Sequence, residues 1–157
     1  MKEFKLTIEL VPVKLWNKSL YNYLTKDKWY QIKKEVKQRE GNRCYICGTQ
    51  SNRLELHEFW DYDDENHIQT LIEFHHLCSL CHKVKHIGFW TMTQDGIEKL
   101  KQEGYTVDDI INHFCRVNQC TRKDFERHKE EAFALWQERN KYKWTQSLGK
   151  YEELLTS

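Results

Sequence analysis

The stretch RCYICG at residues 43–48 has a counterpart in LCSLCHKVKH at residues 77–86. Each stretch contains a CxxC pair, and 30 residues separate Cys47 from Cys78. A CxxC turn presents two thiolates side by side, and two such turns complete the tetrahedral four-sulfur shell that zinc prefers. Gly48 supplies the backbone freedom that the first turn needs. We therefore predict a structural Zn²⁺ site made of Cys44, Cys47, Cys78 and Cys81.

Two histidines follow the second pair, and the four-cysteine site leaves them unexplained. The segment from Ser79 to Gly88 is predicted to be a short helix, and residues four apart on a helix share a face. His82 and His86 would then point the same way, an arrangement that can hold a divalent metal. The alternative is that one of them packs inside while the other is exposed. Their attachment to a CxxC pair favours the metal.

The loop between the two pairs contains RLELHEFWDYDDENH at residues 53–67. Leu54 and Leu56 alternate with polar residues, which predicts a strand with one buried face. The tip of this strand carries His57 and Glu58, which zinc would bring close to the helix with the paired histidines. The acidic run after it is predicted to be a solvated turn, and it consists of Asp61, Asp63, Asp64 and Glu65.

Length and composition limit the class of protein. The 157 residues suit one domain with its own core. No apolar run approaches membrane-spanning length, and MKEFKLTIEL lacks the features of a signal peptide, so we expect a cytoplasmic protein without a membrane partner. In that compartment the six cysteines are metal ligands or buried thiols rather than disulfides. The formal charge of +1 excludes a strong overall attraction to polyanions, so any nucleic-acid surface must be local.

Two further groups of residues leave alternatives open. The basic run over 26–39 is either a solvated helix face or part of a nucleic-acid surface, and Arg43, Lys83 and Lys85 are further candidates for contact with nucleic acid. In the second group, Cys115 and Cys120 are either buried free thiols or, together with His113 and His128, the ligands of another metal site.

The rest of the chain predicts one strand and four more helices. Residues 4–10 alternate as a half-buried strand before Pro12, and 26–40 has helical periodicity between Thr25 and Gly41. A short helix is expected near 94–103. Two capping boxes open later helices, one at Thr106 with Asp109 and one at Thr121 with Asp124. The last helix is predicted to bury a stripe made of Phe125, Ala132, Leu135 and Trp136.

These elements predict one α+β domain over 1–157. Its parts are an N-terminal strand and helix (1–40), a zinc-ribbon core (41–88) and a helical C-terminal extension (89–157).

The combination CxxCG, LELHE and LCxxCHxxxH resembles the HNH endonucleases of the zinc-ribbon type, also called ββα-metal or His-Me finger nucleases. The resemblance covers residues 41–88. More faintly, HEFWDYDD, KHIGF and the later HF followed by VN resemble uncharacterised bacterial and phage proteins classed with HNH nucleases. The resemblance implies a ββα-metal finger and a setting in a phage, a mobile element or a defence system.

The resemblance also implies roles for individual residues. His57 would be a metal ligand, Glu58 the general base, and His82 with His86 the helix ligands of Mg²⁺ or Mn²⁺, in the hydrolysis of phosphodiester bonds in nucleic acid, DNA above all. In the other register His57 is the base and Glu58 the ligand, since the base of this family is usually a histidine. The family's central Asn is absent, and the candidates to replace it are Glu73, His75, His76 and Asn118.

A second function of a different class stays open. The same zinc-stabilised finger could have lost catalysis and bind DNA, RNA or a protein partner. The near-neutral charge and the missing Asn favour this binding protein, whereas the four residues His57, Glu58, His82 and His86 favour the enzyme.

Overall fold

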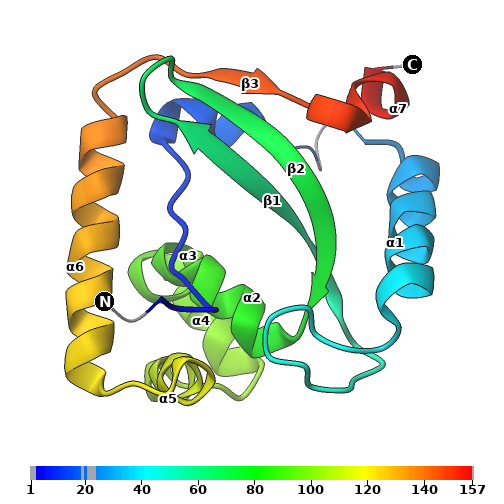
Figure 1. Ribbon diagram of the computed structural model, residues 1–157. Helices are drawn as coiled ribbons and strands as arrows, with labels where there is room; N and C mark the ends of the chain where they lie inside the picture. The colour runs from blue at the N-terminus through cyan, green and yellow to red at the C-terminus, as the bar shows by residue number, and fades with distance from the viewer. Residues whose placement is uncertain (1–2, 19, 21–23, 157) are drawn as a thin grey trace.

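A long antiparallel hairpin forms the centre of the molecule, with helices on both sides (Figure 1). The computed structural model describes residues 3–18, 20 and 24–156. Its elements are, in order, η1 (Val13–Lys18), α1 (Lys26–Glu40), β1 (Glu55–Asp63), β2 (Ile68–Leu77), α2 (Ser79–Lys85), α3 (Ile87–Met92), α4 (Gln94–Gln102), α5 (Val107–Asn118), α6 (Arg122–Arg139), β3 (Thr145–Ser147), η3 (Gly149–Tyr151) and α7 (Glu152–Thr156).

The sheet has the order β1-β2-β3. Strands β1 and β2 pair antiparallel from Glu55 opposite Leu77 to Asp63 opposite Ile68, with an irregularity between Phe59 and Trp60. The short β3 pairs parallel to β2. The strand predicted around Leu56 and His57 is therefore part of a longer β1, although Leu54 precedes it. A second strand was implied only by the resemblance to a ββα finger, and β3 was not predicted. The chain then enters α2 directly after β2, which gives the order strand, strand, helix around the two CxxC pairs.

Helix α1 has the predicted bounds. The Thr25 side chain accepts a hydrogen bond from the backbone N–H of Lys28, and Gly41 ends the helix with a φ of 71°. Ile32 and Val36 are buried on its inner face. They form one core cluster with Leu20 and with three residues of the hairpin, namely Leu56, Leu71 and Phe74.

The predicted strand at 4–10 is wrong, because this segment is extended but belongs to no sheet. Leu6 and Ile8 are buried, as the alternation indicated. Their backbone N–H groups donate to side chains instead of a neighbouring strand: Leu6 to Asn118 Oδ1 at 3.0 Å and Ile8 to His128 Nε2 at 2.9 Å. Figure 1 shows the segment passing between α6 and the α2–α3 pair.

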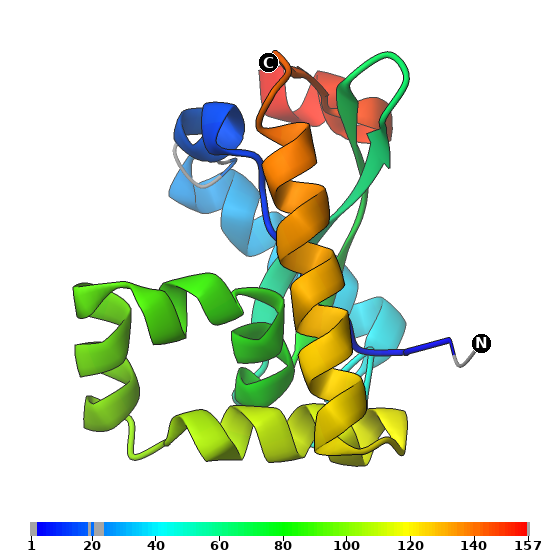
Figure 2. The same ribbon diagram turned by 90° about the vertical axis from the view of Figure 1, so that its left-hand side faces the viewer.

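The C-terminal helices follow the predicted caps. Both capping boxes are present, at Thr106 with Asp109 and at Thr121 with Asp124, and α5 continues to Asn118. The predicted stripe on α6 is correct for Phe125, which is buried, and wrong for Leu135, which is 43 % exposed. Figure 2 shows α6 running across the face of the molecule above α5.

A second core cluster joins the N-terminal segment to α2–α6. It contains Leu6, Ile8, Cys44, Leu77, Cys81, Val84, Ile87, Leu100, Ile110, Phe114 and Phe125. The fold is thus a single α+β domain with a small sheet and several helices. None of the described helices combines the length and the apolar character needed to cross a membrane.

Candidate metal centres

The four cysteines of the two CxxC pairs come together where the loop after α1 meets the start of α2. Their sulfur atoms all lie within 4.8 Å of one another, and Cys47 Sγ is 3.7 Å from Cys78 Sγ. A Zn–S distance of about 2.3 Å places the sulfurs of a tetrahedral site about 3.8 Å apart. Backbone N–H groups of Cys47 and Cys81 donate to the sulfurs of Cys44 and Cys78. The cluster is therefore compatible with a zinc ion.

The charges of these thiols depend on one another. Hydrogen bonds from Cys78 and Cys81 lower the pKa of Cys44, so this sulfur ionises first. The hydrogen bond to Cys44 raises the pKa of Cys78 to about 12, and it raises the pKa of Cys81 as well. A second thiolate beside the first is disfavoured because like charges repel. Four thiolates in this space therefore require a cation, as zinc would supply.

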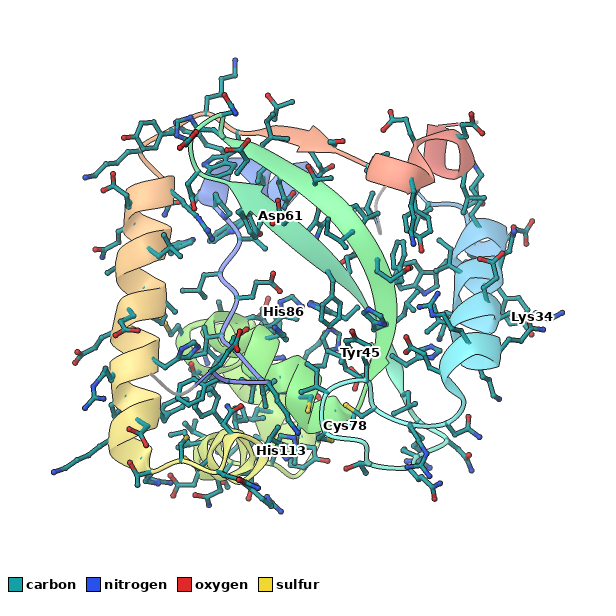
Figure 3. All side chains as sticks on the ribbon, in the orientation of Figure 1. Lys34, Tyr45, Asp61, Cys78, His86 and His113 are labelled. Carbon is teal, nitrogen blue, oxygen red and sulfur yellow. The ribbon has the colours of Figure 1, made fainter. Side chains whose placement is uncertain are left out.

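His113 lies against the same cysteines. Its Nε2 is 3.1 Å from Cys81 Sγ and 3.9 Å from Cys78 Sγ, and burial lowers its pKa, which favours the neutral ring. Figure 3 shows His113 reaching from α5 toward Cys78. A ring N–H that donates to a metal-bound thiolate stabilises its charge and fixes its position. Sequence reasoning missed this contact, because 32 residues separate Cys81 from His113.

The alternative metal site around Cys115 and Cys120 is not formed. Only two groups of three or more potential ligands exist among the described residues, and neither includes these cysteines. Both are partly buried, and neither forms a disulfide. Of the histidines assigned to this group, His113 contacts the four-cysteine cluster and His128 accepts the hydrogen bond from Ile8.

The second group joins three histidines. His57 extends from β1, His82 from α2, and His86 from the junction of α2 and α3, and their nearest ring nitrogens lie within 4.8 Å of one another. The single predicted helix over 79–88 is split at His86, yet His82 and His86 still converge. In Figure 3, His86 lies in the interior beside α2.

Burial lowers the pKa of His57 and of His86, which favours the neutral form of these two rings that binds metals. His57 is 4 % exposed, and neither of its ring nitrogens has a hydrogen-bond partner. Burial, followed by the proximity of His57 and His82, holds the pKa of His86 well below its usual value. Neutral imidazoles are the ligand form, and buried nitrogens without a partner cost about 1–3 kcal/mol each. A bound cation would satisfy one ring nitrogen of each histidine.

Two carboxylates support the three histidines. Glu55 Oε1 lies 3.1 Å from His82 Nδ1, and Glu9 Oε2 lies 3.6 Å from His57 Nε2. Burial would raise the pKa of Glu55, but the hydrogen bond and the charge of His82 outweigh it, so that the pKa is lowered. A carboxylate on the outer nitrogen fixes the ring orientation of a metal-binding histidine. Glu55 could have been found from sequence, since it stands two residues before His57 on the same strand, whereas Glu9 could not.

Glu58 lies next to this cluster but is not part of it. Burial raises the pKa of its carboxyl group, and His82 partly offsets the effect. The ligand group contains His57 together with His82 and His86, and does not contain Glu58. The structure thus groups His57, and not Glu58, with the two later histidines.

The structure counts against two of the three predicted nucleic-acid contacts. Lys83 is 1 % exposed, with its ammonium 2.6 Å from Ser79 Oγ and 3.1 Å from Glu103 Oε1. Lys85 is 6 % exposed and donates to Thr7 Oγ1 at 2.9 Å. Both lysines are enclosed because the N-terminal segment and the later helices cover α2. Arg43 is exposed, as a nucleic-acid contact requires.

None of the candidates for the missing Asn joins the three histidines. Asn118 is held by the Leu6 backbone through both of its amide atoms. Glu73 bonds to Lys150 and Tyr151. His75 pairs with Glu40 and stacks on Tyr45, and His76 faces another pocket. The arrangement therefore offers three histidines and neighbouring carboxylates without an Asn.

The acidic run forms the hairpin turn only in part. Asp61 belongs to β1, whereas Asp63 accepts hydrogen bonds within the turn from Glu65 and Asn66. Asp64 pairs with Arg139 of α6 at 2.8 and 3.0 Å. These contacts agree with the prediction of a solvated turn rather than a metal site.

An apolar pocket of about 460 Å³ borders the three-histidine cluster. Glu9 and His86 form part of its wall, together with aromatic side chains that include Trp16, Phe89 and Trp136. The indole N–H groups of Trp16 and Trp136 both donate to the Val11 carbonyl. The pocket gives a ligand a route to the edge of the cluster at His86.

Comparison with known proteins gives no relative from which a role could be transferred. A scan against protein-family models found no match, and searches of curated proteins and of solved structures found none either.

Proposed function

We propose that this protein is a metal-dependent endonuclease of the HNH type, which hydrolyses phosphodiester bonds in DNA. One observation carries the proposal: His57, His82 and His86 converge within 4.8 Å, and both ring nitrogens of the buried His57 lack a hydrogen-bond partner. A protein that only binds DNA has no physical need for three imidazoles at one point.

The order of elements supports the same proposal. A hairpin followed directly by a short helix brings together one histidine on the first strand, one on the helix and one at the C-cap of that helix, close to the pattern that the resemblance of residues 41–88 implies. We assign structural zinc to the four cysteines, which tie the loop before β1 to the start of α2. The three histidines are then available for a second ion.

The residues near the cluster suit phosphodiester hydrolysis. A divalent ion such as Mg²⁺ or Mn²⁺, held by the three histidines, would stabilise the charge on the leaving 3′ oxygen. Glu55 orients His82, and Glu9 stands beside His57. Glu58 accepts a proton from water, the resulting hydroxide attacks phosphorus, and the P–O3′ bond breaks. Burial of Glu58 strengthens it as a base, because a raised pKa increases its proton affinity.

A cleavage assay tests this proposal. Supercoiled plasmid and single-stranded DNA are incubated with the protein in Mg²⁺, in Mn²⁺ or without added divalent ion. We expect metal-dependent cleavage that is lost in His57→Ala, Glu58→Ala and His82→Ala, while these variants keep their fold and their zinc. The control is His67→Ala, because His67 stacks on Tyr142 outside the cluster. Full cleavage by a folded His82→Ala variant would refute the assignment.

The second candidate is a zinc-stabilised binding protein without turnover. One observation favours it: none of the described candidates for the family's Asn joins the three histidines, since Asn118, Glu73 and His75 each bond elsewhere. A folded, zinc-loaded protein that cleaves no DNA with either metal would favour this alternative.

A further inference from the structure

A second polar pocket lies between α1 and the loop that follows the first CxxC pair. It has a volume of about 380 Å³, within the range of small-molecule sites. Helix α1 forms one wall, the loop forms another, and His76 of β2 contributes the buried part. The lining consists of Tyr30, Lys33, Lys34, Lys37, Asn42, Ser51, Asn52, Leu54 and His76.

The charged side chains that line this pocket are all positive. Lys33, Lys34 and Lys37 are exposed on α1, and none of them forms an ion pair with a described acidic side chain. The lining contains no Asp or Glu. In Figure 3, Lys34 points away from the sheet, which places it at the outer edge of α1. Three cations beside neutral amides and a hydroxyl would attract an anion with several acceptor oxygens.

His76 provides an independent sign of a ligand. Its side chain is only 5 % exposed, and its Nδ1 is buried without a hydrogen-bond partner. The backbone around the ring is held in place, since His76 donates its N–H to Glu40 and its carbonyl accepts from Tyr45. A buried ring nitrogen that lacks a partner is uncommon, and here it belongs to the wall of the basic pocket.

An aromatic side chain completes the pocket. Tyr30 is 72 % exposed and lies one helical turn before Lys33 and Lys34. A cationic groove beside an exposed aromatic ring is the usual means of binding single-stranded nucleic acid, where phosphates meet the cations and a base stacks on the ring.

We propose that this pocket binds the phosphate group of a nucleotide, with the base stacked on Tyr30. Lys33 and Lys37 neutralise the phosphate, and His76 donates to one of its oxygens. The pocket shares no residue with the three-histidine cluster, so the inference does not depend on catalysis there. It also gives a role to the basic run of α1, which the metal centres leave unused.

The test is equilibrium binding of a fluorescent single-stranded oligonucleotide, measured by anisotropy without added divalent ion. The double variant Lys33→Ala/Lys37→Ala should weaken binding on the order of tenfold. The negative slope of log K against log salt concentration should become shallower by about 1.4, because two phosphate contacts are lost. The matched control is Lys101→Ala/Lys123→Ala, which removes the same charge from exposed positions outside the pocket. Equal losses in the two double variants would overturn the proposal.

Two further variants test the contacts with the base and with His76. Tyr30→Ala should weaken binding while Tyr30→Phe restores it, because stacking needs only the ring. His76→Phe keeps the buried volume but removes the nitrogens, so it should keep its zinc and bind more weakly. Unchanged binding by both Tyr30→Ala and His76→Phe would overturn the proposed mode.

Competition then distinguishes the source of the phosphate. Displacement of the oligonucleotide by a nucleoside monophosphate at similar concentration identifies a free nucleotide as the ligand, whereas displacement only by unlabelled oligonucleotide identifies a nucleic-acid strand. No binding of oligonucleotide, nucleoside monophosphate or inorganic phosphate would refute the inference. DNA cleavage with intact metal dependence could still occur in that case, so the two proposals fail separately.

Discussion

Buried histidine ring nitrogens belong to both candidate binding sites proposed for this protein. Three of them are buried without a hydrogen-bond partner in the described part of the chain, two on His57 and one on His76. Each such atom costs about 1–3 kcal/mol if it stays without a partner, so a fold that keeps it there has a use for it. His57 faces the other two histidines, and His76 faces the basic pocket.

His113 should hold the four-cysteine cluster together without being a ligand itself. His113→Ala removes the ring that lies against Cys81 and Cys78, and outer contacts of this kind typically contribute 10–100-fold in metal affinity. Zinc transfer to a chromophoric chelator should therefore be faster by about that factor. His67→Ala serves as the control, and equal rates for the two variants would show that His113 does not support the site.

At the level of secondary-structure elements, features that depend on neighbouring residues were predicted correctly from the sequence. Contacts between residues distant in sequence were not. Thr106 and Thr121 each open a helix with an acidic residue three positions later, and both caps form as predicted, since every atom involved is local. The alternation at 4–10 correctly indicated burial of Leu6. It could not indicate that the backbone partner is Asn118, which is 112 residues away.

The same contrast between local features and contacts distant in sequence applies to the candidate sites. The CxxC spacing identified the four cysteines and the HxxxH spacing identified His82 and His86, because a tight turn or a helix fixes which side chains lie together. His57 was found only from the strand pattern and the resemblance. Lys83 and Lys85 were expected at the surface, as lysines usually are. Tertiary packing encloses them, and no local pattern indicates that Glu103 and Thr7 receive their ammonium groups.

The Asn118 side chain should fix the N-terminal segment to α5. It accepts from Leu6 N–H and donates to Leu6 C=O, at 3.0 and 2.8 Å in a buried position. Asn118→Ala leaves both backbone groups without partners and should lower the free energy of unfolding by about 2–4 kcal/mol. Urea denaturation measures the loss. Asn112→Ala, an exposed change on the same helix, should cost less than about 0.5 kcal/mol, and similar losses for both would contradict the role of Asn118.

Glu73 should make the attachment of η3 to β2 dependent on pH. Burial alone would raise its pKa, but hydrogen bonds from Lys150, Tyr151 and the Phe74 backbone lower it from 4.5 to about 2. Because the folded-state pKa lies below the ordinary value, the stabilisation is complete above about pH 4.5 and is lost as the pH falls toward about 2.

Unfolding of Glu73→Gln across this range measures the effect. The variant should be less stable than the unsubstituted protein near neutral pH, by about 1 kcal/mol or less, since Lys150 is largely exposed. The difference should shrink between about pH 5 and pH 2. Glu65→Gln, in the exposed turn, is the control, and a difference that stays constant with pH would argue against the assignment.

At the scale of the whole molecule, the four-cysteine cluster connects parts that are distant in sequence. Two of its members follow α1, the other two begin α2, and His113 brings α5 to the same point. Cys44 and Cys81 also belong to the core cluster that unites the N-terminal segment with α2–α6. Metal-binding free energy at such a place contributes directly to folding.

Loss of one cysteine ligand should therefore unfold the chain. Structural zinc contributes about 10–16 kcal/mol in small zinc domains, comparable with the whole stability of a typical domain. Cys44→Ser and Cys81→Ser should lose zinc and cooperative thermal unfolding. Cys115→Ser, a change at a partly buried free thiol, should keep both. Full thermal stability of the protein after zinc removal would refute a structural role for the cluster.

Metal stoichiometry tests most directly the proposal that the two clusters bind two metals with different roles. The measurement is zinc content together with a Mn²⁺ titration, followed by the magnetic resonance signal of free Mn²⁺, on the unsubstituted protein and on His82→Ala. We predict one zinc per chain in both, and one bound Mn²⁺ that is lost or weakened at least about tenfold in the variant. Equal Mn²⁺ binding by the two proteins, or none by the unsubstituted protein, would contradict a metal site at His57, His82 and His86.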